Sequence, residues 1–375
     1  MEENINPEQI ESFIEKIKNN ERKKQKKKMN TPFYQTVIMI ILGIFISFFS
    51  QCEVSIANTL LEKYINWNKL KMIISTIEFF VYFIFSSIFA KFKYTKFKFI
   101  YLFISILYCI KNYIYYYGFT RNTFQFPSIA NFWTFIILVC YNLYKFRNKL
   151  YQLPQLYFIG IFFALLANII QFISSYFEIK NNLDDPFRFI FYYSDHRNNF
   201  LAFLSGLSTS LIYILMENYI NERKEIINSL PHIGLYSFLF CLIITIYKKE
   251  FNHINSSRKI FPINYLIFYI GLVILNIIIL FITPFFINKC SALVIGICCS
   301  MRLFFKFFIN QIFITKYYQL TNPGHLFAFI FFILGIGFVC FEIMKDNYPS
   351  SKESIGALLP NEDDQEENLF LKNRK

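Results

Sequence analysis

The sequence has few charged residues for its length. Asp, Glu, Lys and Arg make up only 17% of the 375 residues, and most of them lie in the two tails and in short loops. A soluble domain carries about a quarter of its residues as charges spread along the chain. Here the runs between charged segments stay apolar for about twenty residues, the length that a helix needs to cross a bilayer. The composition therefore excludes an ordinary soluble globular protein and predicts a helical membrane protein with several spans.

Metal-binding and disulfide patterns are also absent. The eight cysteines form no Cys-x-x-Cys pair and no cluster with histidine, and nearly all lie within apolar runs. We therefore expect buried free thiols, with neither a metal site nor a disulfide framework, and we expect no cofactor. The four histidines lie in loops or near predicted helix ends, without metal-ligand spacing.

Several functional motifs are missing as well. The sequence has no phosphate-binding loop of the Gly-x-x-x-x-Gly-Lys-Ser/Thr type, so an ATP-driven pump is not expected. It has no channel selectivity-filter motif, and no nucleophile and base stand out as an enzyme active site. The net charge of +13 does not indicate nucleic-acid binding, because the excess lies near predicted membrane ends. A signal peptide is not expected, so the first apolar run is predicted to insert as an uncleaved anchor.

Ten apolar segments predict ten transmembrane helices. Their expected ranges are 35–60, 70–90, 99–119, 126–145, 155–177, 199–220, 231–247, 263–285, 291–315 and 323–344. The seventh is expected to begin at Pro231, because proline is tolerated at a first helical position. With the amino terminus in the cytoplasm, 23 of the 38 Lys and Arg residues lie on the cytoplasmic side and 12 on the other. This bias predicts that both termini are cytoplasmic.

The predicted spans divide the chain into five parts. These are a basic cytoplasmic tail (1–34), a first five-helix half (35–177), a luminal loop (178–198), a second five-helix half (199–345) and an acidic cytoplasmic tail (346–375). We expect an integral protein of an endomembrane, such as the Golgi, an endosome or a vacuole, or of the plasma membrane. A homodimer is compatible with this layout.

Ionisable residues lie inside the predicted spans, where a charge costs roughly 2.5–3.5 kcal/mol on insertion scales. Arg302, Lys306 and Asn310 share one face of the ninth span because they are four residues apart. Lys111 and Tyr115 share a face of the third. The full set of candidate solute-binding residues is Lys111, Asn112, Tyr115, Asn131, Tyr213, Arg302, Lys306 and Asn310.

Three acidic residues of the spans are candidates for coupling or gating, namely Glu53, Glu78 and Glu217. For any single charge, a fixed ion pair such as Lys111 with Glu78 is the alternative explanation. For the whole set, a polar cavity between helices explains more, because dry packing needs only small residues, Ser and Thr. Small residues such as Gly206 and Gly296 are expected to be close-packing sites.

Four stretches resemble one family of membrane transporters. GLSTSLIYILMENYI at Gly206–Ile220 resembles the sixth helix of that family, and KNYIYYYGFT at Lys111–Thr120 resembles its third. The stretch Leu42–Ser47 resembles part of the first helix, and Lys289–Ala292 resembles the entry to the ninth. The family is the drug/metabolite transporter superfamily, and within it solute carrier family 35, subfamily F.

The resemblance implies two inverted five-helix repeats around a central cavity that opens alternately to each side. In that family the first, third, fourth, sixth, eighth and ninth helices line the cavity, and the candidate solute-binding residues lie on members of this set. The expected function is a secondary transporter of a small polar organic solute, similar to nucleotide-sugar transporters. The midspan cations suit an anionic solute. The expected partners are this small-molecule solute and the lipid bilayer, without nucleic acid.

Two alternatives stay open at this point. One is a membrane receptor or scaffold that has the same fold and transports nothing, because relatives of transporters can lose transport while keeping the fold. The other is a membrane-embedded lipid or acyl transferase, and the lack of a nucleophile–base set counts against it. No enzymatic activity is therefore expected.

Overall fold

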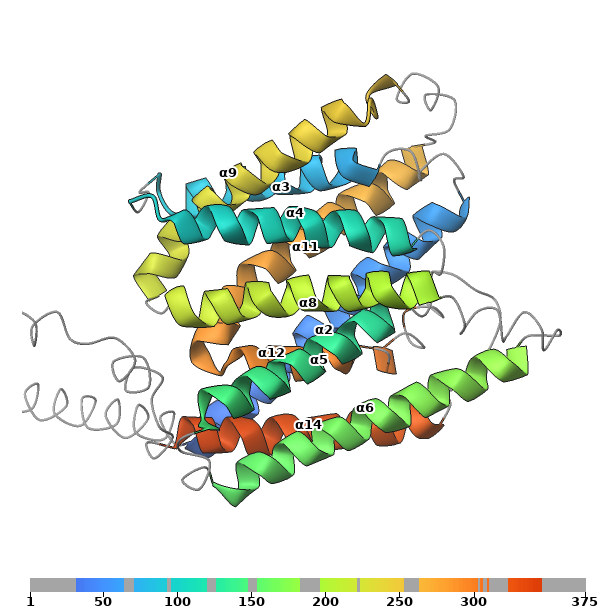
Figure 1. Cartoon of the computed structure of the whole chain (residues 1–375), viewed down its shortest axis with the longest axis vertical. Coiled ribbons are helices and arrows are strands. Elements are labelled where there is room, and N and C mark those ends of the chain that lie inside the picture. The colour runs from blue at the N-terminus through green and yellow to red at the C-terminus, as the bar shows by residue number, and fades with distance from the viewer. Residues whose placement is uncertain are drawn as a thin grey trace, which may run out of the picture.

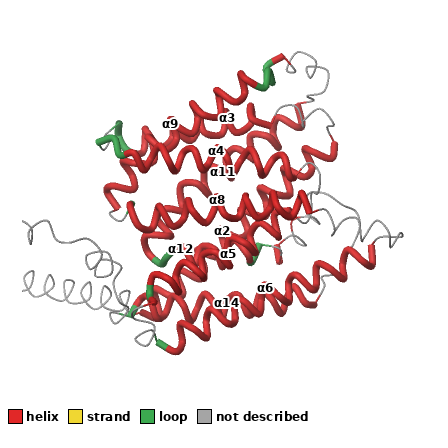
Figure 2. Tube along the Cα trace, in the orientation of Figure 1, coloured by secondary structure: helices red, strands yellow, loops and turns green. Residues whose placement is uncertain are grey.

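The computed structural model is a bundle of helices that run along a common direction (Figure 1, Figure 2). It describes residues 32–63, 71–92, 96–119, 126–147, 154–182, 196–220, 223–252, 263–302, 304–305, 309 and 323–345. The helices within these residues are α2 (Pro32–Lys63), α3 (Lys71–Phe89), α4 (Phe99–Phe119), α5 (Phe126–Lys145), α6 (Gln155–Asn182), α8 (His196–Tyr219), α9 (Arg223–Tyr247), α11 (Ile263–Lys289), α12 (Ala292–Ser300) and α14 (Pro323–Met344). Each of them overlaps one of the predicted apolar segments, and the described residues contain no strand.

Seven of these helices are long and apolar enough to cross a membrane, namely α2, α3, α6, α8, α9, α11 and α14. The described apolar stretch of α4, Phe99–Tyr115, is shorter. α12 has nine residues, a length of about 14 Å, and as a helix it spans only about half of a bilayer core. The helices fit a multi-pass membrane protein, and the full number of ten spans stays a prediction.

The start of α9 differs from the prediction. Pro231 was expected to open this helix, but α9 begins at Arg223 and contains Pro231 in its interior. Glu225 holds the added turns in place, because its carboxylate accepts a hydrogen bond from the Tyr101 hydroxyl at 3.3 Å and forms an ion pair with Lys98. These contacts to α4 and to the residue before it favour a helix start upstream of the proline. The helix bends near its first third (Figure 1).

The predicted ninth span is not one continuous described helix. α12 ends at Ser300, so Arg302 lies in the turn that follows it. The Phe305 N–H donates to the Arg302 carbonyl at 2.9 Å, which is the tighter bond of a 3₁₀ turn. The predicted stripe on this span is therefore tested only in part, because Lys306 and Asn310 lie outside the described residues.

The helices pair across the two halves of the chain. α6 packs against α14, α3 against α9, and α5 against α12. α4 packs on α8 and α9, and its counterpart α11 packs on α2 and α3. Likewise α5 packs on α8, and its counterpart α12 packs on α2. When the helices are counted in chain order, exchanging the first five with the last five maps these pairings onto one another. The packing of α14 on α2 and of α8 on α11 has no counterpart of similar extent.

Glycines allow the paired helices to approach closely. A Cβ atom at Gly160 of α6 would lie 2.9 Å from the carbonyl oxygen of Gly335 in α14. A Cβ atom at Gly206 of α8 would lie 2.6 Å from the Ala130 carbonyl oxygen of α5, and one at Gly296 of α12 would lie 2.7 Å from a leucine of α5. The close-packing role predicted for Gly206 and Gly296 is therefore confirmed, as expected for helices that associate in a membrane.

Candidate functional site

Arg302 is a buried cation deep in the bundle. Its side chain lies just beyond the end of α12, and only 5% of its surface is exposed. α12 begins at Ala292, and a rise of 1.5 Å per residue puts Arg302 about 15 Å along from that end. This distance is half the thickness of a hydrocarbon core of about 30 Å. If α12 starts at one membrane surface, Arg302 lies near the middle of the bilayer.

One edge of the Arg302 guanidinium has no hydrogen-bond partner among the residues that the structure describes. Its Nε and Nη2 atoms are buried and make no hydrogen bond to any residue that the structure describes. The Tyr115 hydroxyl forms a side-chain hydrogen bond with the same group. The Nε–H and Nη2–H bonds point in the same direction, which matches the two oxygens of a carboxylate or phosphate. A buried donor without a partner costs about 1–3 kcal/mol, so a ligand that completes this edge is favoured.

Two other charged residues interact electrostatically with Arg302. Lys111 of α4 has Glu53 of α2 as its main charged partner, ahead of Arg302 and Glu78. The Lys111 ammonium also lies 5.8 Å from the centre of the Tyr108 ring, within cation–π range. Glu53 in turn interacts with Lys111 and with Arg302. The structure therefore groups Lys111 with Glu53 and Arg302, and its interaction with Glu78 is the weakest of these.

Side chains of three helices hold the last turn of α12. Asn131 of α5 donates to the Cys299 carbonyl at 2.6 Å, and Ser47 of α2 donates to the Cys298 carbonyl. Carbonyls in a last helical turn lack the usual partner four residues later. The Cys298 carbonyl also accepts from the Met301 N–H at 3.2 Å, and the two side-chain bonds add to this in fixing the helix end. The hydroxyl of Tyr213 in α8 lies 3.7 Å from the Cys299 sulfur. Asn131, predicted to contact solute, thus positions the backbone that leads into the cationic turn.

Asn112 and Glu78, two of the candidate site residues, form hydrogen bonds between α3 and the helices beside it. Asn112 donates to the Ser75 hydroxyl of α3 at 3.3 Å. Glu78 of α3 is buried, and its carboxylate accepts a hydrogen bond from Asn276 of α11 at 2.9 Å. These bonds link α4 to α3 and α3 to α11. Glu78 adds negative charge near Lys111 but is held by a different helix.

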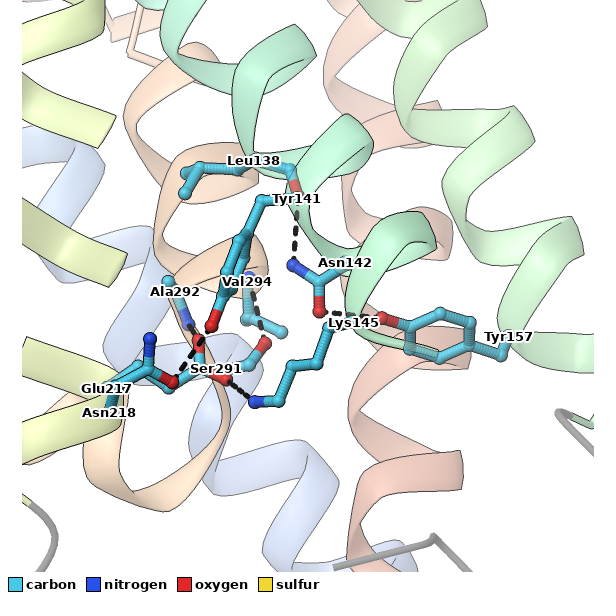
Figure 3. A network of polar contacts seen from close by, with 10 residues as sticks. All are labelled: Leu138, Tyr141, Asn142, Lys145, Tyr157, Glu217, Asn218, Ser291, Ala292 and Val294. Atoms are coloured by element: carbon cyan, nitrogen blue, oxygen red, sulfur yellow. Dashed lines mark hydrogen bonds and ion pairs between the residues drawn. The ribbon is translucent and has the colours of Figure 1, made fainter. Parts of the chain in front are cut away.

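Glu217 lies at the other end of α12 from Arg302. One of its oxygens accepts from Lys145 of α5 at 2.6 Å, and the other accepts from the backbone N–H of Ala292 at 2.8 Å (Figure 3). Ser291 is the N-cap of the same helix. A carboxylate at a helix N-terminus is favourable because it meets unpaired N–H groups and the positive end of the dipole. Glu217 therefore ties together α5, α8 and α12.

Neighbouring polar residues extend this network (Figure 3). The Tyr141 hydroxyl of α5 donates to the Asn218 side chain of α8 at 2.8 Å. The Tyr157 hydroxyl of α6 donates to the Asn142 side chain of α5 at 3.4 Å. These two bonds join α5 to α8 and to α6 at this end.

Sequence reasoning missed Lys145 as the partner of Glu217. It counted Lys145 only as a charge flanking the fourth span. The predicted topology already placed the end of the fourth span and the end of the sixth on the same side of the membrane. Opposite charges at two such helix ends are the signal that was available, but only the packing of α5 on α8 shows that they meet.

The eight cysteines are free thiols, and six of them are buried. Cys140 is exposed, and Cys299 is partly exposed and interacts electrostatically with Arg302 and Lys111. Among the residues that the structure describes, no three His, Cys, Asp or Glu side chains are grouped so that they could hold a metal ion.

Comparison with known proteins adds no assignment. No family model matches the chain, and no curated protein matches it. A functional conclusion therefore depends on the arrangement of the helices and on the residues around Arg302.

Proposed function

We propose that the protein is a secondary transporter that moves a small polar organic solute with an anionic group by alternating access. The observation that carries this proposal is the buried edge of Arg302, where Nε and Nη2 lack a partner among the described residues. A charged group within a membrane is costly and marks a solute or ion pathway by default. Lys111 supplies a second cation, and Tyr115 and Tyr213 supply polar and aromatic groups for the rest of the solute.

The helix pairing supports a fold of two five-helix repeats. Most of the helix pairings map onto one another when the halves are exchanged, as two similar units related by an axis would require, whereas α2–α14, α8–α11, α8–α12 and α12–α14 have no counterpart of similar extent. The break after α12 supports the same fold, because irregular backbone at membrane depth occurs where it lines a cavity or lies buried in protein. The proposed fold has ten spans with both termini in the cytoplasm, as in the drug/metabolite transporter superfamily and solute carrier family 35, which the sequence resembles.

In this proposal Glu217 and its partners close the cytoplasmic end. The excess of Lys and Arg favours an orientation in which the ends of α5 and α8 and the start of α12 face the cytoplasm. The side chains of Lys145 and Glu217 are only 8% and 12% exposed, so water weakens their ion pair little. The pair joins α5 of the first half to α8 and α12 of the second. It has to separate when the site opens to the cytoplasm.

Uptake into proteoliposomes tests the proposed function. The purified protein is reconstituted and given labelled nucleotide sugars, organic anions and vitamins, and we expect saturable uptake of an anionic member of this panel. Arg302→Lys keeps the charge but removes the two-donor edge. Because a hydrogen bond to a charged group contributes about 1.5–3 kcal/mol, this variant should raise KM about tenfold to a hundredfold.

Arg147→Lys is the matched control. Arg147 is exposed, and its guanidinium lies 4.7 Å from the centre of the Tyr144 ring, far from the turn after α12 in the chain. We expect this variant to transport like the wild type. Equal increases in KM for the two variants would contradict the proposed role of Arg302. Thermal stabilisation by a solute that shows no flux would contradict transport itself and favour a receptor.

A further inference from the structure

We propose that a groove between α3 and α11 binds a membrane phospholipid with an acidic head group, with one acyl chain in the groove and the phosphate near Lys91 and Lys289. The groove has a volume of about 640 Å³, and only aliphatic and aromatic side chains of the two helices line it. This inference goes beyond the proposed function and does not depend on transport. α3 belongs to the predicted first half and α11 to the second, so a bound lipid contacts both halves.

The groove is long and narrow. Its α3 side runs from Ile77 to Phe89 through residues spaced four apart, which share one face of the helix over about 18 Å. Dividing the volume of about 640 Å³ by this length of about 18 Å gives a cross-section of about 36 Å², or about 7 Å across. A helix with its side chains is about 10–12 Å wide, so the groove is too narrow for a helix of a second copy. Its length slightly exceeds one leaflet of a hydrocarbon core about 30 Å thick, which suits an acyl chain.

The groove is continuous with the surface that contacts the bilayer. Val273 and Ile277 of α11 are buried and form its floor, whereas Phe85 of α3 and Ile274 of α11 are exposed on its sides. Both helices are long and apolar enough to cross a membrane, so exposed side chains of these spans contact lipid. An acyl chain in the groove therefore replaces an empty space between the helices with van der Waals contacts.

α3 and α11 run in the same direction. Glu78 of α3 accepts a hydrogen bond from Asn276 of α11 at 2.9 Å. Further along both helices, the rings of Phe89 and Phe281 meet with their centroids 4.8 Å apart. The two helices therefore end on the same side of the membrane, and the groove extends to that end.

Two exposed lysines lie at this shared end. Lys91 follows the last residue of α3 by two positions, and Lys289 is the last residue of α11. Neither forms an ion pair with a residue that the structure describes. The excess of Lys and Arg favours the cytoplasmic side for this end, and the cytoplasmic leaflet carries the acidic phospholipids. The charge of such a head group complements the two ammonium groups.

The backbone at Lys91 provides a sharp variant for the test. Its φ angle is +51°, in the left-handed region that favours glycine, and the Lys91 N–H donates to the Ile88 carbonyl at 2.9 Å. Lys91→Gly therefore removes the charge and relieves backbone strain at the same time. Lys249 after α9 has a φ angle of +55° and lies outside the lining of the groove, so Lys249→Gly is the matched control.

Native mass spectrometry of the purified protein in detergent measures the head-group preference. The probes are phosphatidylserine and phosphatidylcholine with the same oleoyl chains. We expect one phosphatidylserine per chain, bound at least about fivefold more tightly than phosphatidylcholine, because one lysine near an acidic lipid contributes about fivefold. Lys91→Gly and Lys289→Gln should each lower the affinity for phosphatidylserine about fivefold. Lys249→Gly should bind it like the wild type.

A second pair of variants tests the groove itself. Ile274→Trp places a large side chain where the acyl chain is proposed to lie, and it should lower the affinity for both phospholipids at least about tenfold. Ile243→Trp is its control, because Ile243 is exposed on α9 outside the lining of the groove. This variant should bind both lipids like the wild type.

Several outcomes would overturn the proposal. They are equal affinity of the wild type for the two phospholipids, equal losses in Lys91→Gly and Lys249→Gly, and displacement of the phospholipid by added cholesterol. A dimer that forms through this face and excludes the lipid would overturn it too. If Ile274→Trp does not fold, as judged by thermal unfolding, Phe85→Ala decides, because it removes one side of the groove. Unchanged affinity in the folded variant overturns the proposal. None of these measurements involves a solute, so failure of the uptake assay leaves the lipid site intact.

Discussion

At the scale of single residues, the charged groups at the two ends of α12 differ in whether they have hydrogen-bond partners. Glu217 at the start is satisfied, because it accepts from Lys145 and from the Ala292 N–H. Arg302 beyond the end keeps two nitrogens without a partner among the described residues. Both charges suit the helix dipole, with the anion at its N-terminus and the cation near its C-terminus. The satisfied group stabilises a fixed contact, whereas the unsatisfied one favours a ligand.

Glu217→Gln should therefore lower stability. The change leaves the largely buried Lys145 ammonium without its anion, and breaking a buried pair in this way costs about 3–5 kcal/mol in soluble proteins. We expect the apparent melting temperature in detergent to fall by several degrees. Adding Lys145→Gln should recover part of the loss, because the two effects are coupled. Fluorescence-monitored thermal unfolding of the single and double variants measures this.

Glu342→Gln provides the control for that comparison. Glu342 also pairs with a lysine, Lys345, but the lysine side chain is 37% exposed and lies three residues away on the same helix. Glu342 itself is only 3% exposed, but water can solvate the partly exposed Lys345 ammonium once its partner is removed, so the melting temperature should fall less than for Glu217→Gln. Equal shifts for Glu217→Gln and Glu342→Gln would show that the Glu217 network does not hold the helices together.

At the scale of elements, the sequence predicted where helices lie better than where they begin and end. Apolar length is a local property, so every described helix overlaps a predicted segment. The start of α9 depends on Glu225 meeting Lys98 and Tyr101, and the end of α12 depends on Asn131 reaching a carbonyl of another helix. Hydrophobic periodicity is a local property of the sequence, so it does not predict contacts between distant segments.

The same limit applied to the candidate site. A charge inside an apolar run is visible in the sequence, and this pattern found Lys111, Arg302 and Glu53. The sequence did not show which residue each charged group contacts, because this depends on which helices pack together. Lys111 interacts mainly with Glu53 on α2, and Asn112 beside it bonds to α3.

The crossing of α5 and α8 gives a prediction at this scale. A Cβ atom at Gly206 would lie 2.6 Å from the Ala130 carbonyl oxygen and 2.9 Å from the Trp133 Cβ. Gly206→Ala should force these helices apart and lower stability by about 1–3 kcal/mol. Gly271→Ala is the control, because the nearest atom to its Cβ would be 3.9 Å away. Thermal unfolding of both variants checks this, and equal stability would contradict the close approach.

At the scale of the whole molecule, the charge networks and most of the helix pairings are consistent with the proposed alternating access. The Glu217 network joins the two halves near one end, and the interactions of Glu53, Lys111 and Arg302 join them deeper in the bundle. In the proposed fold, the two five-helix halves rock about the site between them, so that the bundle opens at one end while it closes at the other. Breaking the Glu217 network should then shift the protein toward a state open to the cytoplasm.

The most direct test of this account is access of water to Cys299, the partly exposed native thiol near Arg302. In a variant whose other seven cysteines are alanine, a membrane-impermeant thiol reagent is applied from each side of sealed vesicles, with an eight-alanine variant as the blank. The account predicts labelling of Cys299 from both sides and faster labelling from the cytoplasmic side after Glu217→Gln. A folded protein whose Cys299 reacts from neither side would contradict alternating access to Arg302.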